Sequence, residues 1–194
     1  MSSTVPEPND TTNGLSLRAA DPSDPAVREA VREITRAAFI IDPVTQRRIE
    51  GDKPPELPMV DAFFAQDAVD HLHVAEEGGR IAAYVMYSRG ALDSDPGLSA
   101  EGLTIMGVLP ERQRQGIGTA LLRWSVARLK GSYDLLFVLG HPEFYARAGF
   151  VEAESLGLRF TYEAPKEACR VLLREGLRVE PGVVSYHPIV GEFC

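Results

Sequence analysis

The chain has 194 residues and a mass of 21.2 kDa, and 44% of the residues are hydrophobic, which is enough for one sizeable core. Its formal net charge of −8 argues against non-specific nucleic-acid binding, which needs a clustered excess of Lys and Arg. The only cysteines are Cys169 and Cys194, so the sequence holds neither a disulfide framework nor a CxxC metal motif.

The N-terminal segment is polar and has little apolar content. Residues 1–13 are mostly Ser, Thr, Pro, Asn and Asp, so we expect a disordered tail ahead of a single domain over residues 14–194. This segment does not resemble a signal peptide, and no run of about 18 apolar residues could span a membrane. We therefore expect a cytoplasmic protein with neither membrane nor nucleic-acid partners.

The first half of the domain is predicted to combine strands with two helices. Leu15–Ala19 alternates apolar and polar residues, as a short strand does, and Asp21–Pro25 supplies residues suited to a turn and a helix cap. The apolar residues of Ala26–Phe39 recur at three- and four-residue steps, which predicts an amphipathic helix. Pro43 and Gly51–Pro58 interrupt regular structure. The next expected elements are a helix over Met59–Ala68, hairpin strands over His71–Ala75 and Ile81–Tyr87, and a loop over residues 89–101.

The second half predicts a strand, a loop, a helix and a strand in that order. Leu103–Leu109 is an apolar run, Gln115–Lys130 has helical spacing, and Tyr133–Leu139 is the continuous apolar run of a strand buried on both faces. Together they predict a βαβ unit with parallel strands. The remaining expected elements are a short helix over Pro142–Ala148, strands over Val151–Thr161 and Cys169–Leu173, and a C-terminal strand or extension within residues 162–194. The predicted fold class is α/β, with a mixed antiparallel and parallel sheet and flanking helices.

The densest chemical signal is Val108–Thr119, with the sequence VLPERQRQGIGT, between a predicted strand and a predicted helix. Backbone amides in such a turn can converge on an anion, and the first helical turn adds unpaired N–H groups and the positive end of the helix dipole. Gly116 and Gly118 allow the backbone to approach a diphosphate, and Arg112 and Arg114 add positive charge. The loop lacks the Lys-Ser or Lys-Thr of a Walker A motif and the third glycine of GxGxxG. The alternative is a basic turn before a helix packed through small residues.

Gln113–Gly118, with the sequence QRQGIG, resembles the Gln/Arg-x-x-Gly-x-Gly/Ala motif of the GNAT superfamily of N-acetyltransferases. The resemblance implies a GNAT acyl-CoA N-acyltransferase fold, with a sheet splayed at its fourth and fifth strands and a bulge within Leu103–Val108. It also implies acetyl-CoA (coenzyme A) as co-substrate, without a metal. The cofactor-binding residues that it implies are Met106, Gly107, Val108, Gln113, Arg114, Gln115, Gly116, Ile117, Gly118 and Thr119.

A second motif follows at Glu143–Phe150, EFYARAGF, which resembles the Tyr-x-x-x-Gly-Phe segment of the same superfamily. The resemblance implies that Tyr145 is the catalytic general acid, because a phenol near the coenzyme A sulfur can protonate the departing thiolate. The alternative is an aromatic side chain that only packs its helix. Leu139–Pro142, LGHP, departs from the superfamily pattern, in which an asparagine lies upstream of the tyrosine, and is similar to a bacterial branch of predicted acetyltransferases.

The implied function is transfer of an acetyl or acyl group to a primary amine of a small molecule or peptide, by direct attack in a ternary complex. A non-catalytic acyl-CoA-binding module of the same fold is the alternative. The general base stays open among Glu101, His141 and a water molecule. The acceptor, the acyl length and the oligomeric state, including a homodimer, also stay open. His71, His73 and Trp124 are assigned no chemistry, because their spacing fits packing.

Overall fold

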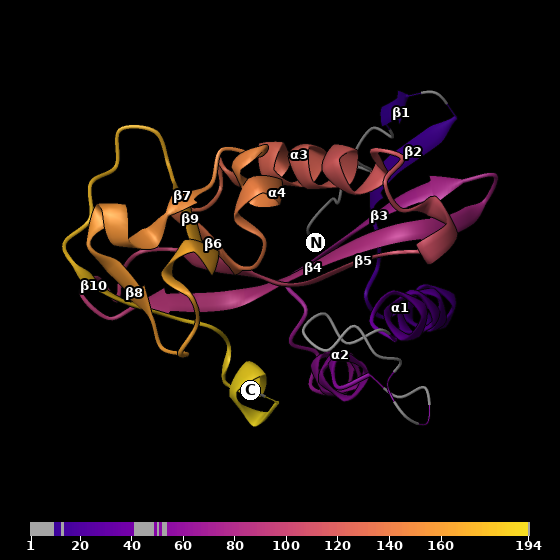
Figure 1. The fold of residues 1–194 in the computed structure, drawn as a ribbon, viewed down its shortest axis with the longest axis horizontal. Helices are drawn as coiled ribbons and strands as arrows, with labels where there is room; N and C mark the ends of the chain where they lie inside the picture. The colour runs from indigo at the N-terminus through magenta and orange to yellow at the C-terminus, as the bar shows by residue number, and fades with distance from the viewer. Residues whose placement is uncertain (1–9, 13, 41–48, 50, 52–53, 194) are drawn as a thin grey trace, which may run out of the picture.

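A ten-stranded mixed sheet forms the centre of the computed structural model, which describes residues 10–12, 14–40, 49, 51 and 54–193. Helices α3 and α4 lie on one side of the sheet and α1 and α2 on the other (Figure 1). The α-helices are α1 (Pro25–Ala38), α2 (Glu56–Ala65), α3 (Ile117–Leu129) and α4 (Pro142–Ala146). The strands are β1 (Asp10–Thr12), β2 (Leu15–Ala19), β3 (His71–Glu77), β4 (Arg80–Leu92), β5 (Ala100–Val108), β6 (Leu135–Leu139), β7 (Val151–Glu152), β8 (Leu158–Phe160), β9 (Cys169–Leu173) and β10 (Gly182–Ser185).

The main path of the sheet runs β1-β2-β3-β4-β5-β6-β9-β7, and β10 pairs with both β4 and β8. The β5–β6 and β10–β8 pairs are parallel, and the other described pairs are antiparallel. Helix α3 connects the parallel strands β5 and β6, as the predicted βαβ unit requires. The predicted α/β class with a mixed sheet and flanking helices is therefore confirmed.

Two hydrophobic cores fill the space between the sheet and its helices. One core joins α1 and α2 to the sheet and includes Val31, Ile34 and Phe63, each at most 1% exposed. The other joins α3 to the opposite face through Leu121 and Leu122, which are fully buried. The strands β4 and β5 therefore lie between α1 on one face and α3 on the other.

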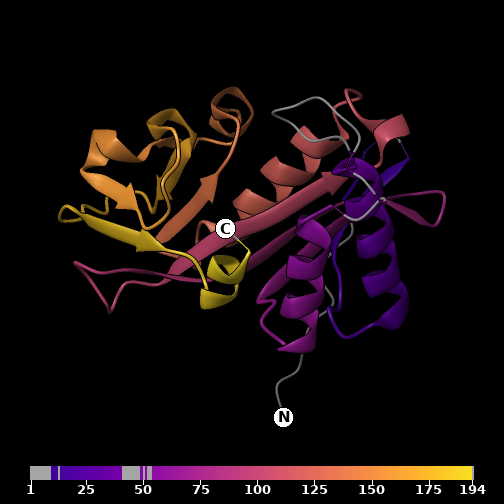
Figure 2. The ribbon, with the colours of Figure 1, turned by 60° about the horizontal axis from the view of Figure 1, so that its bottom comes forward.

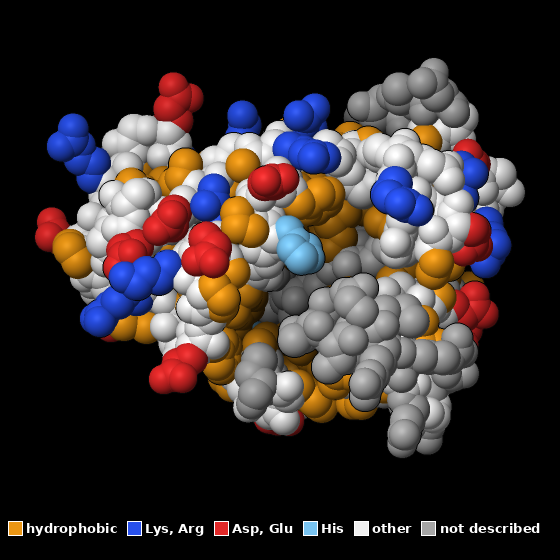
Figure 3. Space-filling model, in the orientation of Figure 1, with side chains coloured by type: hydrophobic (Ala, Val, Ile, Leu, Met, Phe, Trp, Pro, Cys, Tyr) orange, Lys and Arg blue, Asp and Glu red, His pale blue; other side chains and the backbone are white. Residues whose placement is uncertain are grey.

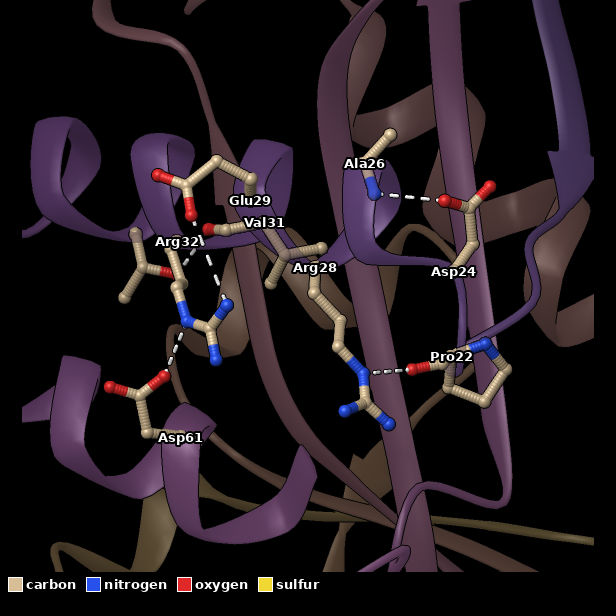
Figure 4. Close-up of polar contacts among 9 residues, drawn as sticks. Pro22, Asp24, Ala26, Arg28, Glu29, Val31, Arg32 and Asp61 are labelled. Carbon is tan, nitrogen blue, oxygen red and sulfur yellow. Dashed lines mark hydrogen bonds and ion pairs between the residues drawn. The ribbon is translucent and has the colours of Figure 1, made fainter. Parts of the chain in front are cut away.

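The start of α1 follows its sequence signals, as Figure 4 shows. The Asp24 carboxylate accepts a hydrogen bond from the Ala26 N–H at 2.8 Å, and Pro25 occupies the first helical turn. The Arg32 guanidinium donates to the Asp61 carboxylate at 2.6 Å and so ties α1 to α2 (Figure 4). The predicted cap and helix are thus both present, and α2 is held against α1 by charge as well as by packing.

Several predicted boundaries are wrong. Val151–Thr161 is not one strand: Gly157, at φ +74°, follows a 3-10 turn and separates β7 from β8. The expected loop over 89–101 is partly strand, since β4 continues to Leu92 where it pairs with β10. The second helix begins at Glu56 rather than Met59.

The predicted disordered tail is wrong for Asp10–Thr12, which pair with β2 as β1. Residues 1–9 and 13 of that tail lie outside the described residues, as do Pro43 and Cys194. At the other end of the described chain, β10 returns to pair with β4 and β8, and the 3-10 helix Pro188–Glu192 that follows it lies beside α2 (Figure 2). Among the described residues, no helix combines the length and apolar character needed to cross a membrane.

Candidate functional site

The strands β5 and β6 pair over only a short stretch and then separate. Their parallel register joins Ala100 to Leu135 and ends at Gly102 and Phe137. Beyond that point no further β5–β6 pair is formed among the described residues. The splayed strands expected from the GNAT resemblance are therefore present.

A bulge interrupts β5 immediately after the splay. Met86 of β4 faces Ile105 and Tyr87 faces Leu103, so Thr104 is an extra residue on β5. The Thr104 hydroxyl meets the Ser88 hydroxyl at 2.7 Å. This observation confirms the bulge predicted within Leu103–Val108, and it turns the backbone of β5 at the mouth of the splay.

A cavity of about 950 Å³ opens at the splay. Its lining residues are Ala38, Phe39, Glu56, Met59, Leu103–Val108, Gln113, Arg114, Gly116, Gly118, Thr119, Leu139–His141, Phe144, Tyr145 and Arg147. Figure 3 shows hydrophobic side chains in a hollow of the molecule and Lys and Arg side chains along the edge that α3 occupies in Figure 1. The cavity thus joins an apolar interior to a basic edge.

The cavity gathers most of the predicted cofactor-binding residues, with two exceptions. The Ile117 side chain is 6% exposed and packs in the core beneath α3. The Gln115 side-chain amide donates to the Glu111 carbonyl at 2.8 Å. The predicted residues that line the cavity are Met106, Gly107, Val108, Gln113, Arg114, Gly116, Gly118 and Thr119, together with Tyr145.

The loop before α3 is shaped by two left-handed residues. Arg114 has φ +59° and Gly116 has φ +84°, a region that glycine adopts without steric cost. Alternation of this kind points successive backbone N–H groups to one side, which is how backbone nests bind anions. The Gln113 side chain donates to the Val108 carbonyl at 3.1 Å and so fastens the loop to the end of β5.

The N-terminus of α3 faces the same space. Gly116 is its capping residue and supplies no side chain to the first N–H groups of the helix. A Cβ on Gly118 would lie 3.3 Å from Val108 and 3.4 Å from Met106, so glycine here lets the helix approach the strand closely. Arg112, which we expected to add mobile positive charge, instead forms an ion pair with Glu77. Arg114 is exposed and lines the cavity.

Tyr145 lies on α4 at the inner wall of the cavity and is 9% exposed. A Cβ on Gly140 would lie 2.4 Å from the Tyr145 ring, so the glycine makes room for it. Burial raises the pKa of the Tyr145 phenol to about 12. Among the described residues, no side chain or backbone group hydrogen-bonds its hydroxyl. Tyr145 therefore brings a protonated hydroxyl to the cavity wall.

The two side chains considered as general bases lie in different environments. His141 is exposed, caps α4 and lines the cavity. Glu101 is 1% exposed and does not line the cavity. Burial raises the pKa of the Glu101 carboxyl to about 8, with smaller effects from Asp70, which raises it, and Arg89, which lowers it. One of its carboxylate oxygens has no hydrogen-bond partner among the described residues.

His73 of β3 packs against α3, which carries Trp124, as the spacing of these residues predicted. The His73 ring meets the Ser125 hydroxyl at 2.8 Å, and Ser125 donates to the Tyr87 hydroxyl at 2.8 Å. Trp124 contacts His73 edge-on, with the ring centres 5.2 Å apart. Burial lowers the pKa of His73 to about 4, with smaller effects from His71 and Arg128. These side chains form a buried polar network outside the cavity.

Sequence patterns did not identify the individual residues that form the cavity wall opposite α3. Phe39 follows α1, and Glu56 and Met59 lie on α2, and all three line the cavity. Their only sequence signal is position: the end of one amphipathic helix and the start of another. Across the described residues, no group of three or more His, Cys, Asp or Glu side chains is placed to hold a metal ion.

Comparison with known proteins agrees with this geometry. The acetyltransferase (GNAT) domain model matches residues 68–152, which contain the splay, the loop and Tyr145. The chain is 28% identical over 120 residues to the uncharacterized N-acetyltransferase YjhQ of Escherichia coli K12, a match that covers 59% of this chain and 65% of that protein.

Solved structures show the same fold over nearly the whole chain. The GNAT family N-acetyltransferase YhbS from Escherichia coli, in complex with CoA, has a TM-score of 0.76 at 21% identity and covers 97% of this chain and 98% of its own. A GNAT family acetyltransferase from Brucella melitensis, in complex with acetyl-CoA, has a TM-score of 0.67 at 28% identity and covers 90% of this chain and 97% of its own. With the splayed strands, the bulge and both sequence motifs in place, residues 68–152 form an acetyltransferase (GNAT) domain, and the fold is that of the GNAT acetyltransferases.

Proposed function

We propose that this protein transfers an acetyl group from acetyl-CoA to the amine of a small molecule or peptide, by direct attack of the amine on the thioester. The observation that carries the proposal is that one cavity joins the loop before α3 to Tyr145. Holding donor and acceptor together in such a cavity removes much of the entropic barrier to their reaction. Residues 14–194 act in this proposal as one domain, because β10 returns to pair with β4.

The pyrophosphate of the donor is assigned to the loop of residues 113–119. Its left-handed residues, the uncapped start of α3 and the exposed Arg114 suit an anion that approaches the backbone closely. Met106, Gly107 and Val108 lie on β5 beyond the bulge, where the strand is not paired with β6. Their backbone groups are therefore placed to bind the extended pantetheine arm. Gln115 and Ile117 contribute through the shape of the loop rather than through their side chains.

Tyr145 is assigned the role of general acid. With a pKa near 12 it keeps its proton across the neutral range. The leaving group is a thiolate, and a cysteine thiol has a reference pKa of about 8.5. Such a thiolate accepts a hydrogen bond from the phenol readily, and this hydrogen bond stabilises the leaving group as it departs. The oxyanion of the tetrahedral intermediate forms before the thiolate leaves. The backbone N–H groups near the Thr104 bulge are candidates to stabilise this oxyanion.

The acceptor amine is assigned to the wall formed by α1 and α2. Glu56 is the one carboxylate among the described residues that line the cavity, and it lies on this wall. A carboxylate there attracts a protonated amine, which must lose a proton before it attacks. His141 lines the cavity and is the better placed of the two candidate side chains to accept that proton, because Glu101 does not line it. A water molecule remains the alternative acceptor.

Ligand binding and turnover test the proposal in two stages. Thermal unfolding of the full chain is followed with acetyl-CoA, longer acyl-CoAs and ATP, and a thiol-release assay then screens polyamines, aminoglycosides, amino acids and peptides. We expect stabilisation by acetyl-CoA but not by ATP, and thiol release that depends on one class of amine. If no coenzyme A compound stabilises the protein, the assignment of the cavity is refuted. Binding without release for any acceptor supports the non-catalytic acyl-CoA-binding module instead.

A further inference from the structure

Tyr186 lies at the point where β5 and β6 separate. It directly follows β10 and is 8% exposed. The Leu139 N–H of β6 donates to the Tyr186 hydroxyl at 2.8 Å, and that hydroxyl donates to the Leu103 carbonyl of β5 at 3.3 Å. One hydroxyl thus bridges the backbones of both splayed strands.

The two bridged groups are those that the next bond of the parallel ladder would join. The Leu135 N–H donates to the Ser99 carbonyl at 3.1 Å, ahead of the β5–β6 register. In a parallel ladder this bond recurs every second residue along both strands. A step of four residues along each strand brings the Leu139 N–H opposite the Leu103 carbonyl. The Tyr186 hydroxyl therefore stands in place of a direct bond between the strands.

The surrounding packing fixes the Tyr186 ring in this position. Its centre is 4.7 Å from that of the Phe137 ring, in an edge-on contact. A Cβ on Gly102 would lie 2.8 Å from both rings, so this glycine leaves the space that they fill. Phe160 and Tyr162 border the same ring, with centres at 6.2 and 6.3 Å. Because the ring is held on several sides, the hydroxyl stays between the strands.

We propose that Tyr186 is a positioning residue whose hydroxyl holds β5 and β6 apart at the apex of the cavity. The proposal rests on the proposed function, since the cavity is taken to bind acetyl-CoA. Without the hydroxyl, the strands either close by one ladder bond or keep an unpaired N–H and C=O. Both outcomes alter the walls formed by Leu103–Val108 and Leu139–His141. The effect falls on binding of the donor rather than on proton transfer at Tyr145.

Tyr186→Phe tests this role because it keeps the ring and removes only the hydroxyl. We expect calorimetry on the full chain to show CoA binding weakened about tenfold, which is the range for a lost hydrogen bond with unsatisfied buried partners. The KM for acetyl-CoA should rise while kcat stays within about twofold of the wild-type value. The matched control is Tyr133→Phe, which loses the hydroxyl contact with His71 at 2.7 Å and does not touch the cavity. Both variants should unfold at lower temperature, and only Tyr186→Phe should bind CoA less tightly.

Wild-type affinity for CoA in Tyr186→Phe overturns the proposal, as does an equal loss of affinity in Tyr133→Phe. A ligand-free measurement separates this proposal from the proposed function. The amide NMR shifts of Leu139 should change in Tyr186→Phe and not in Tyr133→Phe, because only the first loses the acceptor of that N–H. An unchanged Leu139 amide also overturns the proposal. If wild-type protein binds no CoA while the Leu139 amide responds as expected, the proposed function fails and the bridge between the strands stands.

Discussion

Replacing Glu101 by glutamine removes a buried carboxyl group of unusual pKa while keeping the size of the side chain. Burial raises the pKa of this group to about 8 from its ordinary value of 4.5. The folded protein therefore binds the Glu101 proton more tightly than the unfolded chain does. Stability from this proton is complete below pH 4.5 and is lost as the pH rises toward 8. Glutamine carries no titrating proton, so the variant escapes this loss.

The size of the effect follows from the distance between the two pKa values. A pH of about 7.5 lies three units above the pKa of this carboxyl in the unfolded chain. At about 1.4 kcal/mol per unit, the folded wild type has lost about 4 kcal/mol of stability relative to low pH. At about pH 5 the same calculation gives about 1 kcal/mol. The advantage of Glu101→Gln over the wild type should therefore grow by about 3 kcal/mol across this range. His73, whose pKa is lowered to about 4, adds stability as the pH rises toward 6.5, but it is common to both proteins and cancels in the difference.

Urea unfolding, followed through the fluorescence of the single tryptophan, Trp124, measures this difference at each pH. Glu175→Gln is the control, because it makes the same chemical change at an exposed position and should show a difference from wild type that varies little with pH. The reasoning is refuted if the advantage of Glu101→Gln is the same at both pH values. It is equally refuted if the variant is the less stable protein at about pH 7.5.

Four further results are expected. Tyr145→Phe should lower kcat in the thiol-release assay by about 100-fold while leaving CoA affinity within about twofold, and equal loss in both would assign Tyr145 to binding. Gly116→Ala, at φ +84°, should cost about 1 kcal/mol in urea unfolding, and a neutral result would show that the loop relaxes. The ring carbon shifts of His73 in an NMR titration should show a neutral imidazole at pH 6, since its pKa is lowered to about 4; protonation above pH 6 would contradict its burial. Asp24→Ala should cost about 1 kcal/mol of unfolding free energy, because the Ala26 N–H loses its acceptor, and an unchanged urea midpoint would count against the cap.

Features of the fold that depend on neighbouring residues could be predicted from the sequence. The stripe of Val27, Val31 and Ile34 reflects helical periodicity and is buried as expected. The loop before α3 could also be located, because a left-handed turn requires a glycine at Gly116 and the close approach of α3 to β5 requires one at Gly118. Both features are encoded within a few residues, so a pattern along the chain is enough to detect them.

Features that depend on distant segments could not be predicted in this way. Phe39 and Met59 reach the cavity only because α1 and α2 dock on the face of the sheet opposite α3. The burial of Glu101 depends on its place within the sheet, between β4 and β6, whereas its sequence context resembles a loop. The break at Gly157 could not be predicted for a related reason: the apolar residues before and after it extend into β7 and β8, and these two short strands have different partners.

The contacts of Tyr186 also bear on when the cavity is completed during synthesis. Its hydroxyl meets β6 at a residue 47 positions earlier and β5 at a residue 83 positions earlier. Domains form as the chain emerges, and contacts between distant residues are made last. On the role proposed for Tyr186, a nascent chain can already contain α3, its loop and Tyr145 and still lack the bridge between β5 and β6. Tight binding of the donor would then show that β10 and Tyr186 have docked on the sheet. It would distinguish chains in which this segment is folded from chains in which it is not.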